Sequence, residues 1–439
     1  MKTRELYVEV GRLRKSGLGW KRNSNRRSVS GLSTLAVLAS LCACFLAFAH
    51  PAQGQTYQVL YTFCSQTNCT DGATPNPNLV IDKAGNLYGT TQQGGDSLST
   101  EGIAFKISPS GAEEVLFNFE NLSTGVQPMG GLILDADGNL YGTASVGGYV
   151  QKRKNCGSTG CGLVFELSPS GGETILHDFI NTLTWQGRFP FGPLVRDANG
   201  NLFGLVNGFG QATQGGLFEL KTDGSESVLY WFGGSKAPKD PNPGLLMDAQ
   251  GDIYGTSNSG GAHHAGAVFE INPAGEETTL YSFGNKKALQ YGTRPAAGLV
   301  MDTSGNFYGT TSGEDSYGAS FGTVFQLPPG QTSPKLLYAF QGQPDGSSPI
   351  GSLLRDAEGN LYGTTYWGGV YDQGAVYKLS PAGVETVLYS FSGGTDGANP
   401  MGGLTMDGQG NLYGTTLRGG NTQCPKYNGG CGVVFKVTP

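Results

Sequence analysis

Six cysteines are the residues whose spacing most directly predicts chemistry. Cysteines close in sequence can form local disulfides, or their thiolates can bind a metal ion. Zinc sites usually have tighter C-x-x-C pairs, with a second pair or a histidine nearby. We therefore predict three disulfides, no metal site and no cofactor. The close pairs, each around a polar or glycine-rich stretch, are Cys64 with Cys69, Cys156 with Cys161, and Cys424 with Cys431.

Residues suited to acid–base or nucleophilic catalysis are scarce. The sequence has four histidines, and His263 and His264 are adjacent. Two adjacent imidazoles do not easily converge on one metal ion. No H-E-x-x-H or phosphate-binding loop motif occurs. The sequence therefore assigns no catalytic residue.

Aspartates recur in the pattern D-x-x-G-N, as in Asp407–Thr416, DGQGNLYGTT. Alternating oxygens such as those of Asp135, Asp137 and Asn139 could bind calcium, but no bidentate glutamate follows at the distance of a calcium loop. An aspartate that opens a turn instead accepts hydrogen bonds from backbone amides, and the glycine supplies positive φ. We predict structural hairpin turns. The seven copies begin at Asp82, Asp135, Asp197, Asp248, Asp302, Asp356 and Asp407.

These turns belong to a repeat with a period of 51 to 62 residues. One unit, Pro349–Phe391, contains four short strand patterns joined by tight turns or a glycine-rich loop. Four antiparallel strands make one blade of a propeller. Seven copies predict an all-β fold, a seven-bladed β-propeller over residues 56–439.

The two ends of the repeat array are out of phase. Thr56–Phe63, TYQVLYTF, matches the fourth strand of a unit, such as Glu385–Phe391. The chain ends with Gly432–Pro439, which matches a third strand. We therefore expect the N-terminal strand to complete the last blade beside Gly432–Val437, which removes two free sheet edges.

Two sets of connections vary between units: the crossings from one blade to the next, and the loops between second and third strands. In an antiparallel blade both sets emerge on one face, and all three cysteine pairs fall within them. Loops on a rigid scaffold commonly bind ligands, and aromatic rings beside acids suit a carbohydrate or an extended peptide. Asp71 is one polar candidate in a crossing. The predicted ligand-binding residues are Trp185, Arg188, Asp240, Tyr291, Arg294, Asp345, Tyr366, Trp367 and Asp396.

The N-terminus resembles a targeting segment. Met1–Gly31 carries nine Lys or Arg, and the apolar run Leu32–Ala49 ends in a small-x-small pattern. Residues 1–49 are therefore predicted to be a signal peptide and residues 50–55 a linker, with cleavage after Ala49 or Gly54. The alternative is a retained membrane anchor, since the run approaches spanning length. The expected location is secreted or periplasmic.

The chain that remains after cleavage is acidic. It keeps 28 − 9 = 19 basic and 34 − 2 = 32 acidic residues, a net charge of −13. Such a surface repels phosphate backbones, so we expect no nucleic-acid partner. We also expect a monomer without membrane contact after signal cleavage.

The repeat resembles the GloVer tandem repeat of exported bacterial proteins. The resemblance rests on a series of motifs in constant order: N-L-Y-G-T-T, a glycine pair, G-x-V-F-x-L, S-P-x-G and E-T-V-L-Y-S-F. The resemblance covers Thr56 to Pro439, and the inner hairpin, as in Leu404–Gly414, is also similar to NHL propeller repeats. The family brings no catalytic residues to this chain. We expect a binding module for a carbohydrate or protein on the loop-rich face. The alternative is an extracellular hydrolase or lyase that acts on a polysaccharide or ester in the central channel.

Overall fold

Strands and short connections make up nearly all of the part of the chain that the structure describes. This computed structural model describes residues 55–96, 101–148, 156, 159–179, 187–207, 214–285, 289–313, 321–422, 424 and 429–439. These residues belong to one compact unit, Gly54–Pro439. Its helical turns in the described part are η1 (Thr67–Cys69) and η2 (Leu289–Tyr291), and no described helix is long and apolar enough to cross a bilayer. The predicted signal peptide lies outside the described residues.

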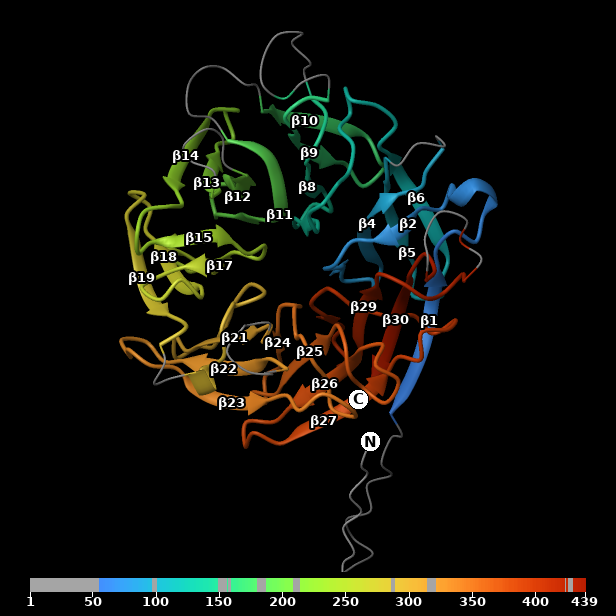
Figure 1. The fold of residues 1–439 in the computed structure, drawn as a ribbon. Coiled ribbons are helices and arrows are strands. Elements are labelled where there is room, and N and C mark those ends of the chain that lie inside the picture. The colour runs from blue at the N-terminus through green and yellow to red at the C-terminus, as the bar shows by residue number, and fades with distance from the viewer. Residues whose placement is uncertain are drawn as a thin grey trace, which may run out of the picture. The chain divides into compact units, whose positions relative to one another are not determined.

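Each repeat forms one antiparallel sheet, and the described residues contain seven such sheets around a common centre (Figure 1). We number the blades 1 to 7 from β3 onwards. The first strands are β3 (Val80–Ile81), β7 (Ile133–Leu134), β11 (Arg188–Arg196), β16 (Leu246–Met247), β20 (Val300–Met301), β24 (Leu354–Arg355) and β28 (Thr405–Met406). The second strands are β4 (Leu87–Gln93), β8 (Leu140–Ala144), β12 (Leu202–Asn207), β17 (Ile253–Gly260), β21 (Phe307–Thr311), β25 (Leu361–Thr365) and β29 (Leu412–Thr416).

The outer half of each blade holds the third and fourth strands. Two further strands, β2 (Ala73–Pro75) and β15 (Pro238–Pro241), lie in crossings and pair with β4 and β17. The third strands are β5 (Ile103–Ile107), β9 (Leu163–Leu167), β13 (Gly216–Leu220), β18 (Ala267–Ile271), β22 (Thr323–Leu327), β26 (Ala375–Leu379) and β30 (Val433–Thr438). The fourth strands are β6 (Glu113–Asn118), β10 (Glu173–Asp178), β14 (Glu226–Trp231), β19 (Glu277–Ser282), β23 (Lys335–Ala339), β27 (Glu385–Ser390) and β1 (Thr56–Thr62).

The N-terminal strand β1 closes the ring. It pairs antiparallel with β30, so that Thr56 lies opposite Thr438 and Thr62 opposite Val433. The last sheet has the strand order β1-β30-β29-β28, and blue β1 lies beside red β30 in Figure 1. The predicted seven-bladed propeller and its closure by the N-terminal strand are therefore confirmed.

The glycine of the repeated word L-Y-G-T makes room for an aromatic ring. A Cβ at Gly89 would lie 2.6 Å from the ring of Phe105, and the equivalent Gly309 is as close to Phe325. The same third-strand ring contacts the last phenylalanine of the preceding blade edge-on, with ring centroids 5.0 to 5.3 Å apart. Each interface between blades is therefore built on one aromatic pair. The pairs are Phe63–Phe105, Phe119–Phe165, Phe179–Phe218, Phe232–Phe269, Phe283–Phe325, Phe340–Tyr377 and Phe391–Phe435.

A β-bulge recurs in every fourth strand. The pairing register shifts there by one residue, as between Val59 and Tyr61 opposite β30. The carbonyl oxygen of the extra residue, Leu60, points at the next blade, where a Cβ at Gly111 would lie 2.9 Å from it. The S-P-x-G turn needs glycine at this position because the neighbouring backbone approaches so closely.

The D-x-x-G-N turns have the structure that the sequence predicts. The Oδ1 atom of Asp356 accepts a hydrogen bond from the Asn360 amide at 2.7 Å, and Oδ2 accepts one from Asn360 Nδ2. The structure adds a partner, because the Tyr362 hydroxyl donates to Oδ2 at 3.0 Å. Burial alone would raise the pKa of Asp356, but these hydrogen bonds outweigh it and hold the pKa below its ordinary value.

Candidate functional site

The crossings and the second-to-third-strand loops carry all three cysteine pairs, as predicted. The structure contains the disulfides Cys64–Cys69, Cys156–Cys161 and Cys424–Cys431. The first lies in the crossing after β1, the second between β8 and β9, and the third between β29 and β30. Because these connections share one end of the antiparallel blades, the disulfides brace the loop-rich face.

Every crossing turns at a residue in the left-handed conformation that directly precedes a proline. In all seven blades this residue is not glycine, and its φ lies between 52° and 55°. Its amide donates to a carbonyl of the preceding blade, as Arg294 does to Ala265 at 2.8 Å. These hydrogen bonds offset a strain of roughly 1–2 kcal/mol per residue. The seven residues, here called the crossing ring, are Thr74, Gln127, Phe189, Asp240, Arg294, Ser348 and Asn399.

The crossing ring brings two of the predicted ligand-binding residues into equivalent positions. Asp240 and Arg294 occupy successive blades, and both side chains are exposed. Asp240 accepts a hydrogen bond from Ser259 at 2.6 Å. Gln127 is also exposed and Phe189 is partly exposed, so blades 2 to 5 present an open row of unlike side chains.

Three acids of the crossings are engaged inside the protein. Asp345 accepts hydrogen bonds from the Tyr338 hydroxyl at 3.0 Å and the Gln341 amide at 2.8 Å. Asp396 binds Tyr389 and Ser392 in the same way. Asp71 is fully buried and accepts from Tyr61 and Ser65. These contacts tie each crossing to the preceding fourth strand, and the ligand-binding role of Asp345 and Asp396 stays a prediction.

The remaining predicted residues differ in their surroundings. Arg188 lies over the Phe189 ring, 5.3 Å from its centroid, with Nη1 3.9 Å from Cys156 Sγ, and burial lowers its pKa. Tyr291 is half-buried in η2, where its carbonyl accepts a hydrogen bond from Thr323. Trp185 lies outside the described residues.

An apolar patch covers the loops of blades 5 and 6. It consists of Phe321, Trp367, Val370 and Tyr371, with 41%, 38%, 59% and 59% of their surfaces exposed. The Tyr366 ring packs edge-on against the Trp367 ring, with the two ring centroids 4.9 Å apart. A chain of backbone hydrogen bonds joins the two loops, since Ser348 donates to the Phe321 carbonyl and accepts from the Tyr366 amide. The apolar patch is thus held on a fixed backbone.

Next to the crossing ring, closer to the first strands, the chain forms a narrow collar. A Cβ at Gly298 would lie 2.2 Å from the Gly244 carbonyl oxygen, and one at Gly351 would lie 2.3 Å from that of Gly402. A Cβ at Gly244 would even meet Ser352 Oγ, two blades away, at 3.3 Å. No residue of the collar ionises. The collar comprises residues 75–78, 128–131, 190–193, 241–244, 295–298, 349–352 and 400–403.

On the opposite face, one cleft of about 490 Å³ lies between blades 3 and 4, and another of about 800 Å³ lies between blades 7 and 1. Both are lined mainly by the hairpin turns of the repeat. Their aspartates, such as Asp248 and Asp407, already bind backbone amides of their own turns. The aspartates of these turns are therefore engaged within their own hairpins.

Four partly buried glutamates predict a pH-dependent stability of the folded protein. Glu113, Glu173, Glu226 and Glu385 begin four fourth strands, and burial raises the pKa of each to about 7. The folded state therefore binds more protons than the unfolded state between about pH 4.5 and 7, so stability falls as pH rises through this window. Since these side chains are about half exposed, we expect each to contribute about 1 kcal/mol.

Chemical denaturation at pH 5 and pH 8 measures this effect. The wild type should be more stable at pH 5, and Glu385→Gln should flatten the difference by about 1 kcal/mol. Glu358→Gln, in an exposed turn, is the matched control and should leave it unchanged. A wild type that is equally stable at both pH values would contradict the expectation.

Seven blades closed by the N-terminal strand, with the variable loops gathered on one face, define an all-β seven-bladed propeller. The model of the Gloeobacter/Verrucomicrobia repeat matches residues 153–321 and 290–439. The chain belongs to this repeat family, as the resemblance in its sequence predicted.

Comparisons with other proteins give only distant likenesses. No curated protein matches the chain. A manganese complex of oligogalacturonate lyase is 12% identical, with a TM-score of 0.49, and the match covers 88% of this chain and 96% of that one. A putative gluconolactonase is 14% identical, with a TM-score of 0.39 and coverage of 71% and 89%. TolB from Acinetobacter baumannii is 11% identical, with a TM-score of 0.38 and coverage of 64% and 58%.

Proposed function

We propose that this propeller is a binding module that engages a protein partner through its loop-rich face. The apolar patch carries this proposal, because Phe321, Trp367, Val370 and Tyr371 stay exposed on loops that are otherwise fixed by hydrogen bonds. Large apolar side chains that stay exposed on neighbouring loops are typical of interaction sites. Aromatic residues are enriched at the centres of protein interfaces.

A protein partner fits the patch better than a carbohydrate does. Sugar recognition needs polar side chains beside the aromatic ring to bind hydroxyl groups. Asp372, beside Tyr371, accepts a hydrogen bond from the Gly368 amide through Oδ1. The crossing acids Asp345 and Asp396 are engaged by tyrosines and backbone amides. The patch also includes the aliphatic side chain of Val370. A carbohydrate is the second candidate, because the exposed rings of Trp367 and Tyr371 offer stacking surfaces.

The composition of the collar argues against the alternative function, a hydrolase or lyase that acts in the central channel. General acid–base catalysis needs titratable side chains within reach of the substrate. The collar has none. This composition favours binding over catalysis at the axis.

We also propose that the protein acts outside the cytoplasm. Three disulfides in a chain of this kind suit an oxidising compartment. The basic and apolar pattern of residues 1–49 supports export.

Photo-crosslinking from two opposite faces tests the binding proposal. A photoreactive residue at Tyr371, 59% exposed on the loop-rich face, should capture a discrete partner from the exported protein fraction. The same residue at Val384, 62% exposed in a turn of the opposite face, is the matched control and should not. Trp367→Ala should weaken the captured interaction about tenfold or more, because aromatic anchors contribute about 2 kcal/mol.

A glycan array run in parallel separates the two ligand classes. If the array retains a glycan and Trp367→Ala abolishes that retention, the ligand of the patch is a carbohydrate and not a protein. Identical crosslinks from both faces, or none from either face together with no glycan retained, would contradict binding through the patch.

A further inference from the structure

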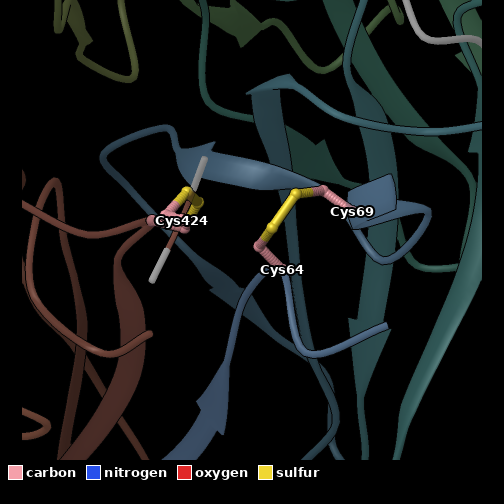
Figure 2. A group of neighbouring side chains, drawn as sticks. Cys64, Cys69 and Cys424 are labelled. Atoms are coloured by element: carbon pink, nitrogen blue, oxygen red, sulfur yellow. A yellow bond between two sulfur atoms is a disulfide. The ribbon is translucent and has the colours of Figure 1, made fainter. Parts of the chain in front are cut away.

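Two disulfides that are far apart in sequence lie side by side in blade 7. Cys64 and Cys69 follow β1, whereas Cys424 and Cys431 precede β30. The four Sγ atoms all lie within 4.8 Å of one another. Figure 2 shows the Cys64–Cys69 disulfide beside Cys424. The closure of the ring produces this cluster, since it places the first strand against the last.

The backbone around the sulfurs is fixed by contacts that do not depend on the disulfides. Asn421 Nδ2 donates to the Cys64 carbonyl at 2.7 Å, which joins the two loops. The Thr74 amide donates to the Cys431 carbonyl at 2.9 Å. The Cys64 amide donates to Gly72, and the Cys69 carbonyl accepts from the amides of Gly72 and Gly95. The Cys424 amide donates to the Asn421 carbonyl at 3.4 Å, so reduction of the sulfur–sulfur bonds would leave the four thiols close together.

We propose that the reduced cluster is a tetrathiolate binding site for Zn²⁺. A dithiol reductant supplies two electrons and two protons to each disulfide, which yields four thiols and the oxidised reductant. Zn²⁺ then displaces the thiol protons and binds four thiolates. Zn–S bonds of about 2.3 Å in a tetrahedron place the sulfurs about 3.8 Å apart. The present positions, within 4.8 Å, reach this geometry by small side-chain rotations.

The surroundings select a soft cation. Cys431 is fully buried, and Cys64 and Cys424 are 7% exposed. The cluster packs among Phe63, Leu79 and other apolar side chains. Four sulfurs in apolar surroundings suit Zn²⁺, Co²⁺ or Cd²⁺, whereas Ca²⁺ and Mg²⁺ need oxygen ligands.

Metal binding would change what the cysteines hold together. Each disulfide links residues only five or seven positions apart, within one loop. A single ion bound to all four thiolates would instead link the loop that follows β1 to the loop that precedes β30. The site would thus join the two ends of the ring directly. Cys156–Cys161 has the same spacing as Cys64–Cys69 but no second pair beside it among the described residues, so it is an internal control.

Co²⁺ titration of the full chain tests the proposal, with Cys42→Ser and Cys44→Ser as background and a phosphine as reductant. We expect one Co²⁺ per chain, with the sulfur-to-cobalt charge-transfer and visible bands of a tetrahedral tetrathiolate site. The double variant Cys424→Ser, Cys431→Ser should lose these bands. The control Cys156→Ser, Cys161→Ser should keep them. Absent bands in the reduced parent, or bands that survive in the first variant, would overturn the site.

A second experiment maps the thiols of the same reduced parent chain. It replaces none of the six cysteines, so a variant that fails to fold cannot affect the result. Alkylation without and with Zn²⁺, followed by peptide mass spectrometry, should find that Zn²⁺ protects Cys64, Cys69, Cys424 and Cys431 but leaves the labelling of Cys156 and Cys161 unchanged. Zn²⁺ should also raise the temperature of unfolding of the reduced protein. Equal labelling of all six cysteines would overturn the proposal.

Discussion

Phe63→Ala should lower the free energy of unfolding by about 3–5 kcal/mol, the usual result of emptying a fully buried phenylalanine site. Phe63 directly follows β1, has no exposed surface and packs edge-on against Phe105 of blade 1 at 5.0 Å. The residue therefore acts at the interface between blades 7 and 1, directly after β1, whose pairing with β30 closes the ring within blade 7. Loss of this contact weakens the attachment of β1 as well as the core.

Urea denaturation of Phe63→Ala beside Phe283→Ala measures this effect. Phe283 occupies the same position between blades 4 and 5, with Phe325 at 5.2 Å. We expect both variants to lose similar stability, because the two interfaces have the same geometry. A loss under about 1 kcal/mol for Phe63→Ala alone would contradict the packing of Phe63 between blades 7 and 1.

Gly298→Val should be destabilised by about 3 kcal/mol or more, since overpacking that displaces backbone is costly. A Cβ at Gly298 would lie 2.2 Å from the Gly244 carbonyl oxygen, and this neighbour is backbone that cannot rotate away. The substitution pushes the collar segments 241–244 and 295–298 apart and strains their connections to blades 4 and 5.

Gly408→Ala is the control for this variant. Gly408 lies in a hairpin turn, and a Cβ there would meet nothing within 4 Å. Its stability should change by less than about 0.5 kcal/mol. Thermal unfolding of both variants checks the difference. A Gly298→Val protein with wild-type stability would show that the collar is wider than its backbone contacts indicate.

The architecture could be predicted from the sequence because its determinants are local and repeated. The turns beginning at Asp356 and its equivalents, and the out-of-phase segment Thr56–Phe63, fixed the strand count and the closing partner. Both depend on residue type and order alone. Prediction of the three disulfides succeeded for the same reason, because their partners are five or seven residues apart.

The face that carries the loops was harder to predict. Asp345 and Asp396 looked available for a ligand, but tyrosines of the preceding fourth strands bind them across the crossing. Nothing in a residue such as Arg294 signals positive φ, because non-glycine residues avoid it. The meeting of Cys69 with Cys424 depends on how two loops fold after the ring has closed. Such contacts are set by tertiary packing, which spacing along the chain does not encode.

In the crossing ring the backbone conformation is constant, whereas the residue type differs at every position. Its seven backbone angles agree within a few degrees, yet its members are threonine, glutamine, phenylalanine, aspartate, arginine, serine and asparagine. No residue type occurs twice, so the bend places almost no demand on the side chain that it presents. The ring's four exposed or partly exposed members, in blades 2 to 5, are the natural positions to randomise for a library of new affinity reagents.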